Sequence, residues 1–220
     1  MIRSSRRVLA LGLMLLLGTL GCVPLQGSNI SPPAHTTPAS TARLSATDIW
    51  QPPPGTTWQW QLKETIDTSF DVAMYDIDLF DAPQATIAQL HSDGRIVICY
   101  FSAGSWENWR DDAGAFPEAL LGSPLDGWPD EKWLDIRQID QLAPVMKARL
   151  DLAVTKQCDG VEPDNVDGYT NDSGFPLTGE DQLVFNRWLV EQAHSRGGSL
   201  GSQGVDMKNR VRPCRSSQIR

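Results

Sequence analysis

The sequence has few of the residues that bind transition metals or nucleotides. Its 220 residues include four cysteines and three histidines, with no Cys-x-x-Cys motif and no Cys/His cluster, so we expect no metal site. No glycine-rich phosphate loop follows the first expected strand, which argues against a nucleotide-binding doubly wound sheet. We therefore expect the protein to use no cofactor.

Positive charge is scarce in the central part of the chain. Residues 48–197 contain 10 Lys plus Arg and 26 Asp plus Glu, so 10 − 26 = −16, whereas the whole chain has a formal net charge of −8. Nucleic acid is not expected as a partner, because binding to phosphates needs a basic surface. The acidic central part suits a cationic or neutral substrate. Acidic residues that lie on a solvated surface and bind nothing would give the same composition.

A hydrophobic run long enough to cross a bilayer is also missing. Residues 8–20 are apolar but too short, and they follow three arginines, a pattern typical of a signal peptide. The run ends in Thr19-Leu20-Gly21-Cys22, which resembles a bacterial lipobox with Thr19 in place of the usual Leu. We expect residues 1–22 to direct export and Cys22 to be lipidated. Ordinary signal cleavage beside an incidental cysteine is the alternative.

The segment after this signal is typical of a tether. Residues 23–47 are rich in Ser, Thr, Pro and Ala, and we expect them to form a disordered linker. With the lipid anchor, the protein would be a lipoprotein of the bacterial cell envelope and would contact the membrane only through that anchor. Without the anchor, it would be secreted. Export implies an oxidising compartment, in which Cys99 could pair with Cys158, although spacing alone does not establish that bond.

Expected strands and helices alternate through the central residues 48–197, which we assign to one domain. The pattern predicts strands at 58–62, 70–76, 95–101, 133–137 and 160–164, and helices at 83–93, 141–156 and 179–195. The segment from 116 to 130 is expected to be irregular. Polar pairs recur at strand ends, which favours a parallel (β/α) barrel: Asp76/Asp78, Tyr100/Ser102, Asp135/Arg137 and Glu162/Asp164.

The most informative stretch is Glu162-Pro163-Asp164-Asn165-Val166-Asp167. Side chains alternate along a strand, so Glu162 and Asp164 share a face at its carboxyl end, where parallel α/β folds place their chemistry. Acids in a buried strand cost stability unless they have partners or a function. We therefore expect the active site here. The alternative is that Asp164 forms a structural salt bridge with Arg137 on the adjacent strand.

Four motifs occur in the same order as in glycoside hydrolase family 114, the endo-α-1,4-polygalactosaminidase-like proteins. They are Tyr75-Asp76-Ile77-Asp78, the stretch from Cys99 to Glu107, Trp133-Leu134-Asp135-Ile136-Arg137, and the stretch from Asp159 to Tyr169. The resemblance covers roughly residues 50–197 and implies an α/β fold of the (β/α)8 TIM-barrel type. It also implies hydrolysis of α-1,4 links in a galactosamine-containing, partly cationic polysaccharide.

The resemblance places one catalytic carboxylate in the Glu162–Asp167 motif. Glycosidases need two carboxylates, and we assign Asp164, preferably as the nucleophile, together with Glu162, whose like charge could raise a pKa. Aromatic rings and polar side chains suit sugar binding, and the candidates are Tyr75, Asp76, Asp78, Tyr100, Trp106, Glu107, Asn165 and Asp167. Asp76 and Asp78 would equally well close a turn. We expect Trp128, Trp133 and Trp188 in the core.

The sequence departs from the family pattern after Gly197. The resemblance implies further barrel strands there, with a second catalytic glutamate, but residues 198–220 are rich in arginine and lack a periodic apolar pattern. We count five or six strands and expect an incomplete barrel, from a truncated or frame-shifted gene, that is inactive or poorly folded. A non-catalytic carbohydrate-binding surface lipoprotein and a structural or interaction protein are the alternatives. We expect a monomer.

Overall fold

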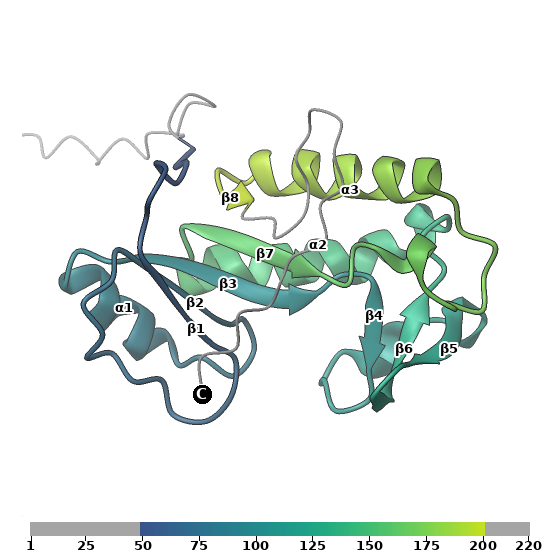
Figure 1. Cartoon of the computed structure of the whole chain (residues 1–220), viewed down its shortest axis with the longest axis horizontal. Helices are drawn as coiled ribbons and strands as arrows, with labels where there is room; N and C mark the ends of the chain where they lie inside the picture. The colour runs from purple at the N-terminus through teal and green to yellow at the C-terminus, as the bar shows by residue number, and fades with distance from the viewer. Residues whose placement is uncertain (1–48, 201–220) are drawn as a thin grey trace, which may run out of the picture. The chain divides into compact units, whose positions relative to one another are not determined.

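The fold is an α/β arrangement around one parallel sheet (Figure 1). The computed structural model describes residues 49–200. The sheet has the order β1-β2-β3-β7-β8, all neighbours parallel, with β1 at Trp58–Gln61, β2 at Met74–Asp78, β3 at Ile96–Ser102, β7 at Gly160–Asp164 and β8 at Ser199–Leu200. The predicted parallel α/β fold with five or six strands is confirmed, and within 49–200 the sheet covers part of a barrel.

Three helices connect and cover the strands. They are α1 at Gln84–Ser92, α2 at Ile139–Lys156 and α3 at Gly179–His194, each close to its predicted range. Helix α3 begins with a capping box, which Thr178 and Asp181 form. Helix α1 contacts β3, while α2 contacts both β7 and α3, so the helices bury the apolar strands on their own side.

The second strand begins later than its sequence indicates. Phe70 and Val72 form a tight turn, in which Val72 N–H donates to the carbonyl of Phe70, and β2 starts only at Met74. It then extends to Asp78, two residues beyond the predicted range of 70–76, so Asp76 and Asp78 both lie within a buried strand. Both carboxylates are thereby held at fixed positions of the sheet.

A second, antiparallel sheet replaces the irregular segment and the expected strand at 133–137. It has the order β4-β6-β5, with β4 at Ser105–Glu107, β5 at Leu121–Leu125 and β6 at Trp128–Leu134. Asp135 and Arg137 therefore follow an antiparallel strand, and the prediction that they end a barrel strand was wrong. The sequence did not predict this sheet, because glycine and proline are uncommon inside strands and its strands contain Gly122, Pro124 and Pro129. In Figure 1 the small sheet lies beyond the arrowheads of β3 and β7.

The core contains a disulfide between Cys99 and Cys158, which links β3 to the turn before β7 with a Cα–Cα distance of 6.0 Å. Trp133 is buried and Trp188 packs against the core, as expected. Trp128 is 52% exposed, so its assignment to the core was wrong; Lys63 Nζ lies 5.0 Å from its ring centroid.

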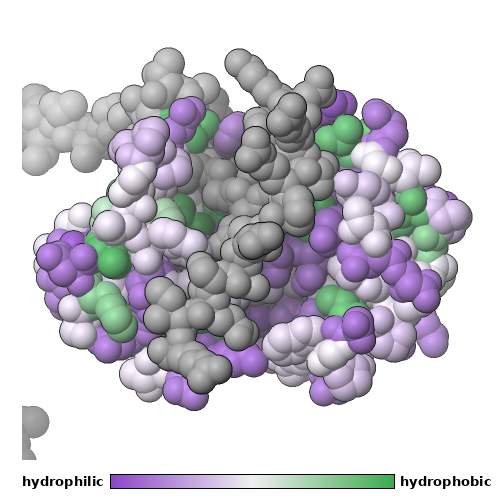
Figure 2. Space-filling model, viewed as in Figure 1, coloured by the Kyte–Doolittle hydropathy of each residue, from purple (hydrophilic) through white to green (hydrophobic). Residues whose placement is uncertain are grey.

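The face of the molecule in Figure 2 is largely polar outside the grey atoms. On the face in Figure 2 hydrophobic side chains occur in scattered spots outside the grey atoms. Of the helices in residues 49–200, none is long and apolar enough to cross a membrane. The expected signal, lipid-anchored Cys22, the linker and nearly all of the 198–220 tail lie outside the described residues.

Candidate active site

Three parallel strands bring their carboxyl ends together at one edge of the sheet. Register sets Asp78 beside Tyr100, Tyr100 beside Glu162, and Ser102 beside Asp164. Because the strands are parallel, the polar residues that end them meet at this edge. The sequence-predicted residues of β2, β3 and β7 therefore lie in one region.

Asp164 is partly exposed at the end of β7. Tyr100 Oη donates to its Oδ2 at 2.9 Å, and Oδ1 accepts none of the hydrogen bonds found among the described residues. Burial, followed by the Asp164 charge, raises the pKa of Tyr100 above its ordinary value of 10.0, so the phenol remains a donor. The alternative salt bridge to Arg137 is not formed, since Arg137 binds Asp135 at 2.7 and 2.8 Å.

Asp76 and Glu162 form a buried pair of carboxyl groups next to Asp164. Their relative exposures are 3% and 5%, and the two side chains hydrogen-bond to each other. Burial raises the pKa of Asp76 well above its ordinary value of 3.8, and the neighbouring Glu162 raises it further. Burial also raises the pKa of Glu162. Asp76 Oδ1 and Glu162 Oε2 are both buried, and neither accepts a hydrogen bond from a nitrogen or hydroxyl group of the described residues, so the pair depends on the proton that its two carboxyl groups share.

The chain turns sharply after Asp164. Asn165 has a left-handed backbone with φ of 57°, and a Cβ on Gly104 would lie 1.8 Å from its carbonyl oxygen, so only glycine fits at 104. Asn165 Nδ2 donates to Ser102 Oγ at 2.9 Å and to Ser105 Oγ at 3.1 Å. Ser105 Oγ in turn donates to Glu131 Oε2 at 2.7 Å.

Glu131 is a buried acid of the site that sequence reasoning missed. It lies on β6, is 9% exposed, and burial raises its pKa, with the charges of Glu107 and Asp164 adding to that effect. Its sequence neighbourhood, Pro129-Asp130-Glu131, looks like a polar loop. Only the pairing of β6 with β4 turns its side chain inward, so no local signal could have identified it.

Asp78 and Glu107 lie in a buried ion-pair network. Arg110 donates to Asp78 at 3.0 and 2.6 Å and to Glu107 at 3.0 Å, while Arg149 binds both oxygens of Asp112 at 2.8 Å. Arg149 Nη1 also donates to the carbonyl of Ser102 at 2.6 Å. The network stabilises the end of β3, because Arg149 binds the carbonyl of Ser102, the last residue of that strand. A role of Asp78 or Glu107 in substrate binding stays a prediction.

The remaining candidates lie at different depths. Tyr75 is fully buried, and its hydroxyl donates to the carbonyl of Phe70 at 2.9 Å. Trp106 is partly exposed, its indole N–H donates to the carbonyl of Ala113, and Lys132 Nζ lies 5.6 Å from its ring centroid. Asp167 is exposed just before the short helix η3 at Gly168–Thr170. Within residues 49–200 no group of His, Cys, Asp and Glu could hold a metal ion.

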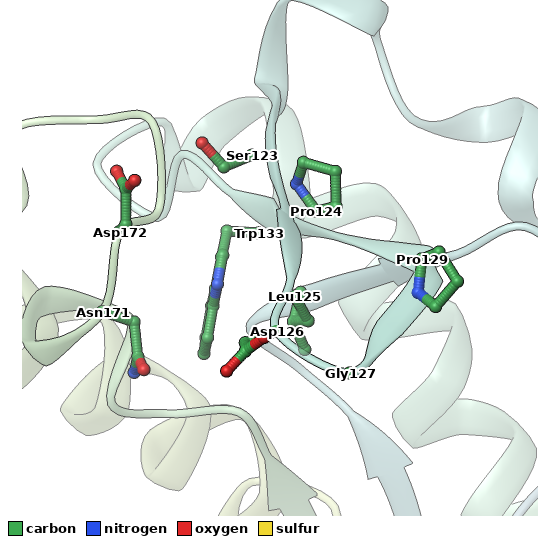
Figure 3. A pocket seen from close by; sticks show the side chains of 9 residues that line it. All are labelled: Ser123, Pro124, Leu125, Asp126, Gly127, Pro129, Trp133, Asn171 and Asp172. Atoms are coloured by element: carbon green, nitrogen blue, oxygen red, sulfur yellow. The ribbon is translucent and has the colours of Figure 1, made fainter.

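A pocket of about 510 Å³ lies beside the small sheet (Figure 3), between β5, β6 and the segment after η3. Asp126 from the β5–β6 turn and Asp172 from the segment after η3 lie on either side of the buried Trp133 in this view. The full lining is Ser123, Pro124, Leu125, Asp126, Gly127, Pro129, Trp133, Asn171 and Asp172. The pocket does not include the carboxyl groups of β2 and β7.

A partial parallel barrel with acids at its strand ends is an arrangement that glycoside hydrolases share with other barrel enzymes. The sequence model of glycoside-hydrolase family GH114 matches residues 39–213. The chain belongs to family GH114, so the resemblance read from the four motifs is confirmed.

The solved structures that are similar to the chain include two that share its family or its fold. One is Ega3 of Aspergillus fumigatus in complex with galactosamine, with 52% identity, a TM-score of 0.67, and coverage of 69% of this chain and 61% of Ega3. The chain thus spans about three fifths of the length of Ega3. The other is the glycoside hydrolase domain of PelA from Pseudomonas aeruginosa, with 12% identity, a TM-score of 0.49, and coverage of 66% and 58%. The search of curated proteins found no match.

Proposed function

We propose that the chain is a glycoside hydrolase that cleaves α-1,4 links in a galactosamine-containing polysaccharide, with Asp164 as one of two catalytic carboxylates. The observation that carries the proposal is the geometry of Asp164. It ends β7, is partly exposed, and receives a hydrogen bond from Tyr100 on one oxygen only. The other oxygen is therefore available to a sugar, as nucleophile or as base.

The amino-sugar substrate is supported by the acids around Asp164. Asp76 and Glu162 lie close enough to Asp164 to interact with its charge, and an ammonium group of the substrate would be attracted to this group of acids. The relative Ega3 was solved with galactosamine bound. An ammonium group would also be attracted to the acidic central part of the chain, because residues 48–197 contain 26 acidic and 10 basic residues.

Asp164→Asn tests the assignment. A glycosidase that loses one of its two carboxylates loses most of its transition-state stabilisation, so we expect hydrolysis of polygalactosamine to fall by about 10³-fold or more. The measurement is the release of reducing ends. Asp130→Asn, which removes an exposed carboxylate on β6, is the matched control.

The outcomes separate the candidate functions. Turnover by the wild-type chain that Asp164→Asn abolishes supports hydrolysis. Affinity for the polymer without any release of reducing ends, in wild type and variant alike, would instead support a carbohydrate-binding surface lipoprotein. Failure to bind any hexosamine polymer would contradict both.

We further propose export and lipid anchoring at Cys22. The support is the sequence alone: three arginines, a short apolar run and the lipobox-like Thr19-Leu20-Gly21-Cys22. Metabolic labelling with a radioactive fatty acid should mark the wild-type protein and not Cys22→Ser. Labelling that persists in the variant would contradict the assignment.

A further inference from the structure

We propose that Glu131 is a positioning residue for Asp164. Glu131 anchors a chain of hydrogen bonds that runs through two serines to Asn165, the residue that follows Asp164. This inference rests on the proposed function, because Asp164 is assigned to catalysis there.

The hydrogen-bond chain has one direction. Ser105 Oγ has a single proton, which it donates to Glu131 Oε2 at 2.7 Å. Ser105 Oγ must therefore accept from Ser102 Oγ at 2.5 Å, and Ser102 Oγ accepts from the backbone N–H of Ser105 at 3.1 Å. Both serine oxygens then accept from Asn165 Nδ2. The acid at one end thus determines how the amide at the other end is oriented.

Fixing Asn165 also fixes Asp164. The carbonyl of Asp164 accepts from the backbone N–H groups of Ala103 at 2.9 Å and Gly104 at 3.1 Å. The next residue, Asn165, is held in the left-handed conformation by its side chain. The peptide group between Asp164 and Asn165 is therefore fixed by hydrogen bonds to both residues. Because the backbone is fixed at this point, the orientation of the Asp164 side chain is restricted as well.

The burial of Glu131 needs a reason that stability alone does not supply. Ser102 and Ser105 are 0% exposed and Glu131 is 9% exposed, so the chain lies in a region of low dielectric constant, where hydrogen bonds are strong. Glu131 also stands directly opposite Glu107 in the β4–β6 ladder. Like charges opposite each other destabilise a sheet. A role in positioning Ser105, and through it Asn165, would explain why an acid is present at 131 despite this cost in stability.

The test compares two substitutions with a control on the same strand. Glu131→Gln keeps an oxygen that can accept from Ser105, whereas Glu131→Leu removes every acceptor. Asp130→Asn removes the neighbouring exposed carboxylate. The first measurement is the ¹H–¹⁵N NMR spectrum of the Asn165 side-chain amide, which needs no enzymatic activity. The second is the steady-state hydrolysis of a galactosamine oligomer.

We expect Glu131→Leu to shift both Asn165 amide signals, and Glu131→Gln and Asp130→Asn to leave them near their wild-type positions. A misplaced catalytic group costs on the order of 10²-fold in rate, so kcat should fall by about 10- to 100-fold in Glu131→Leu. KM should stay within about threefold, because binding of the ground state is not the affected step. Glu131→Gln should retain most of kcat.

Two results would overturn the proposal. One is an Asn165 spectrum that Glu131→Leu leaves unchanged. The other is an equal loss of kcat in Glu131→Gln and Glu131→Leu, which would assign the effect to the charge of Glu131 and not to the hydrogen-bond chain. If the wild-type chain hydrolyses nothing, the proposed function fails, while the spectra still decide whether Glu131 holds Asn165.

Discussion

At the scale of single residues, the site depends on acids that the fold keeps out of water. Asp76 and Glu162 are each no more than 5% exposed and share a hydrogen bond between two carboxyl groups, which requires at least one proton. Asp164, by contrast, is partly exposed and receives a hydroxyl donor. The fold thus places three neighbouring acids in two different environments, one buried and one partly exposed, and enzymes use such differences to divide acid and base roles between carboxylates.

The Asp76–Glu162 pair makes folding stability depend on pH. Burial raises the pKa of both groups in the folded protein above their ordinary values. The folded state therefore keeps protons that the unfolded chain releases, and stability falls as the pH rises from about 4 through the raised pKa values. We expect the double variant Asp76→Asn/Glu162→Gln to be more stable than wild type at pH 8, by about 1–3 kcal/mol, and to differ less at pH 5.

Urea unfolding at several pH values measures this effect. The control is Asp111→Asn/Glu118→Gln, which removes two exposed acids. A stability difference between the Asp76/Glu162 variant and wild type that is the same at pH 5 and pH 8 would contradict the expected linkage.

At the scale of elements, the end of β3 is supported by a helix through buried charge. Arg149 on α2 is 1% exposed, binds Asp112 through two nitrogens and donates to the carbonyl of Ser102, the last residue of β3. Its Nη1 also lies 4.0 Å from Glu107 Oε2, a buried oxygen without a hydrogen bond. The helix therefore positions the strand end that carries the serine chain.

Removal of this arginine should destabilise the protein strongly. Breaking a buried ion pair by removing one partner costs about 3–5 kcal/mol. Here the change would leave the partly exposed Asp112 without its partner and would remove the Arg149 donor from the carbonyl of Ser102. We expect Arg149→Met to lose an amount in this range in urea unfolding, although methionine keeps the apolar stem. Arg187→Met on α3, at an exposed position, is the control and should change stability by less than about 0.5 kcal/mol. A loss below about 1 kcal/mol for Arg149→Met would show that the network is not structural.

At the scale of the whole molecule, charge favours a cationic ligand. Residues 48–197 carry a formal charge of 10 − 26 = −16. Attraction between this body and a ligand with several ammonium groups is long-ranged and is screened by salt. Two of the acids, Asp126 and Asp172, line the pocket of about 510 Å³ beside the small sheet.

Affinity for a de-acetylated galactosamine oligomer should therefore fall several-fold as NaCl is raised from about 20 to 500 mM, since the Debye length shortens to a few ångströms. Titration calorimetry measures this affinity with the Asp164→Asn variant, because the wild-type chain would hydrolyse the oligomer during the titration. The fully N-acetylated oligomer is neutral and serves as the control ligand. An affinity for the cationic oligomer that is independent of salt would contradict a role for the acidic body.

The local structure around the site followed from the sequence where the pattern is regular. The apolar strand at 95–101, the acidic strand at 160–164 and the capped helix from Gly179 were each predicted within a few residues. The disulfide between Cys99 and Cys158 was left open by spacing, because only the pairing of β3 with β7 brings the two cysteines within bonding distance.

The sequence by itself determined the parallel α/β class, the family and the motif that contains Glu162 and Asp164, since these depend on periodicity and on residues close together in the chain. Tertiary structure alone decided the neighbours of these acids. The β4-β6-β5 sheet brings Glu131 to Ser105, and the packing of β2, β3 and β7 into one sheet brings Asp76 to Glu162 and Tyr100 to Asp164. Such contacts join residues from 26 to 86 positions apart (131 − 105 and 162 − 76). No local pattern encodes them, because strand pairing is set by packing of the whole sheet.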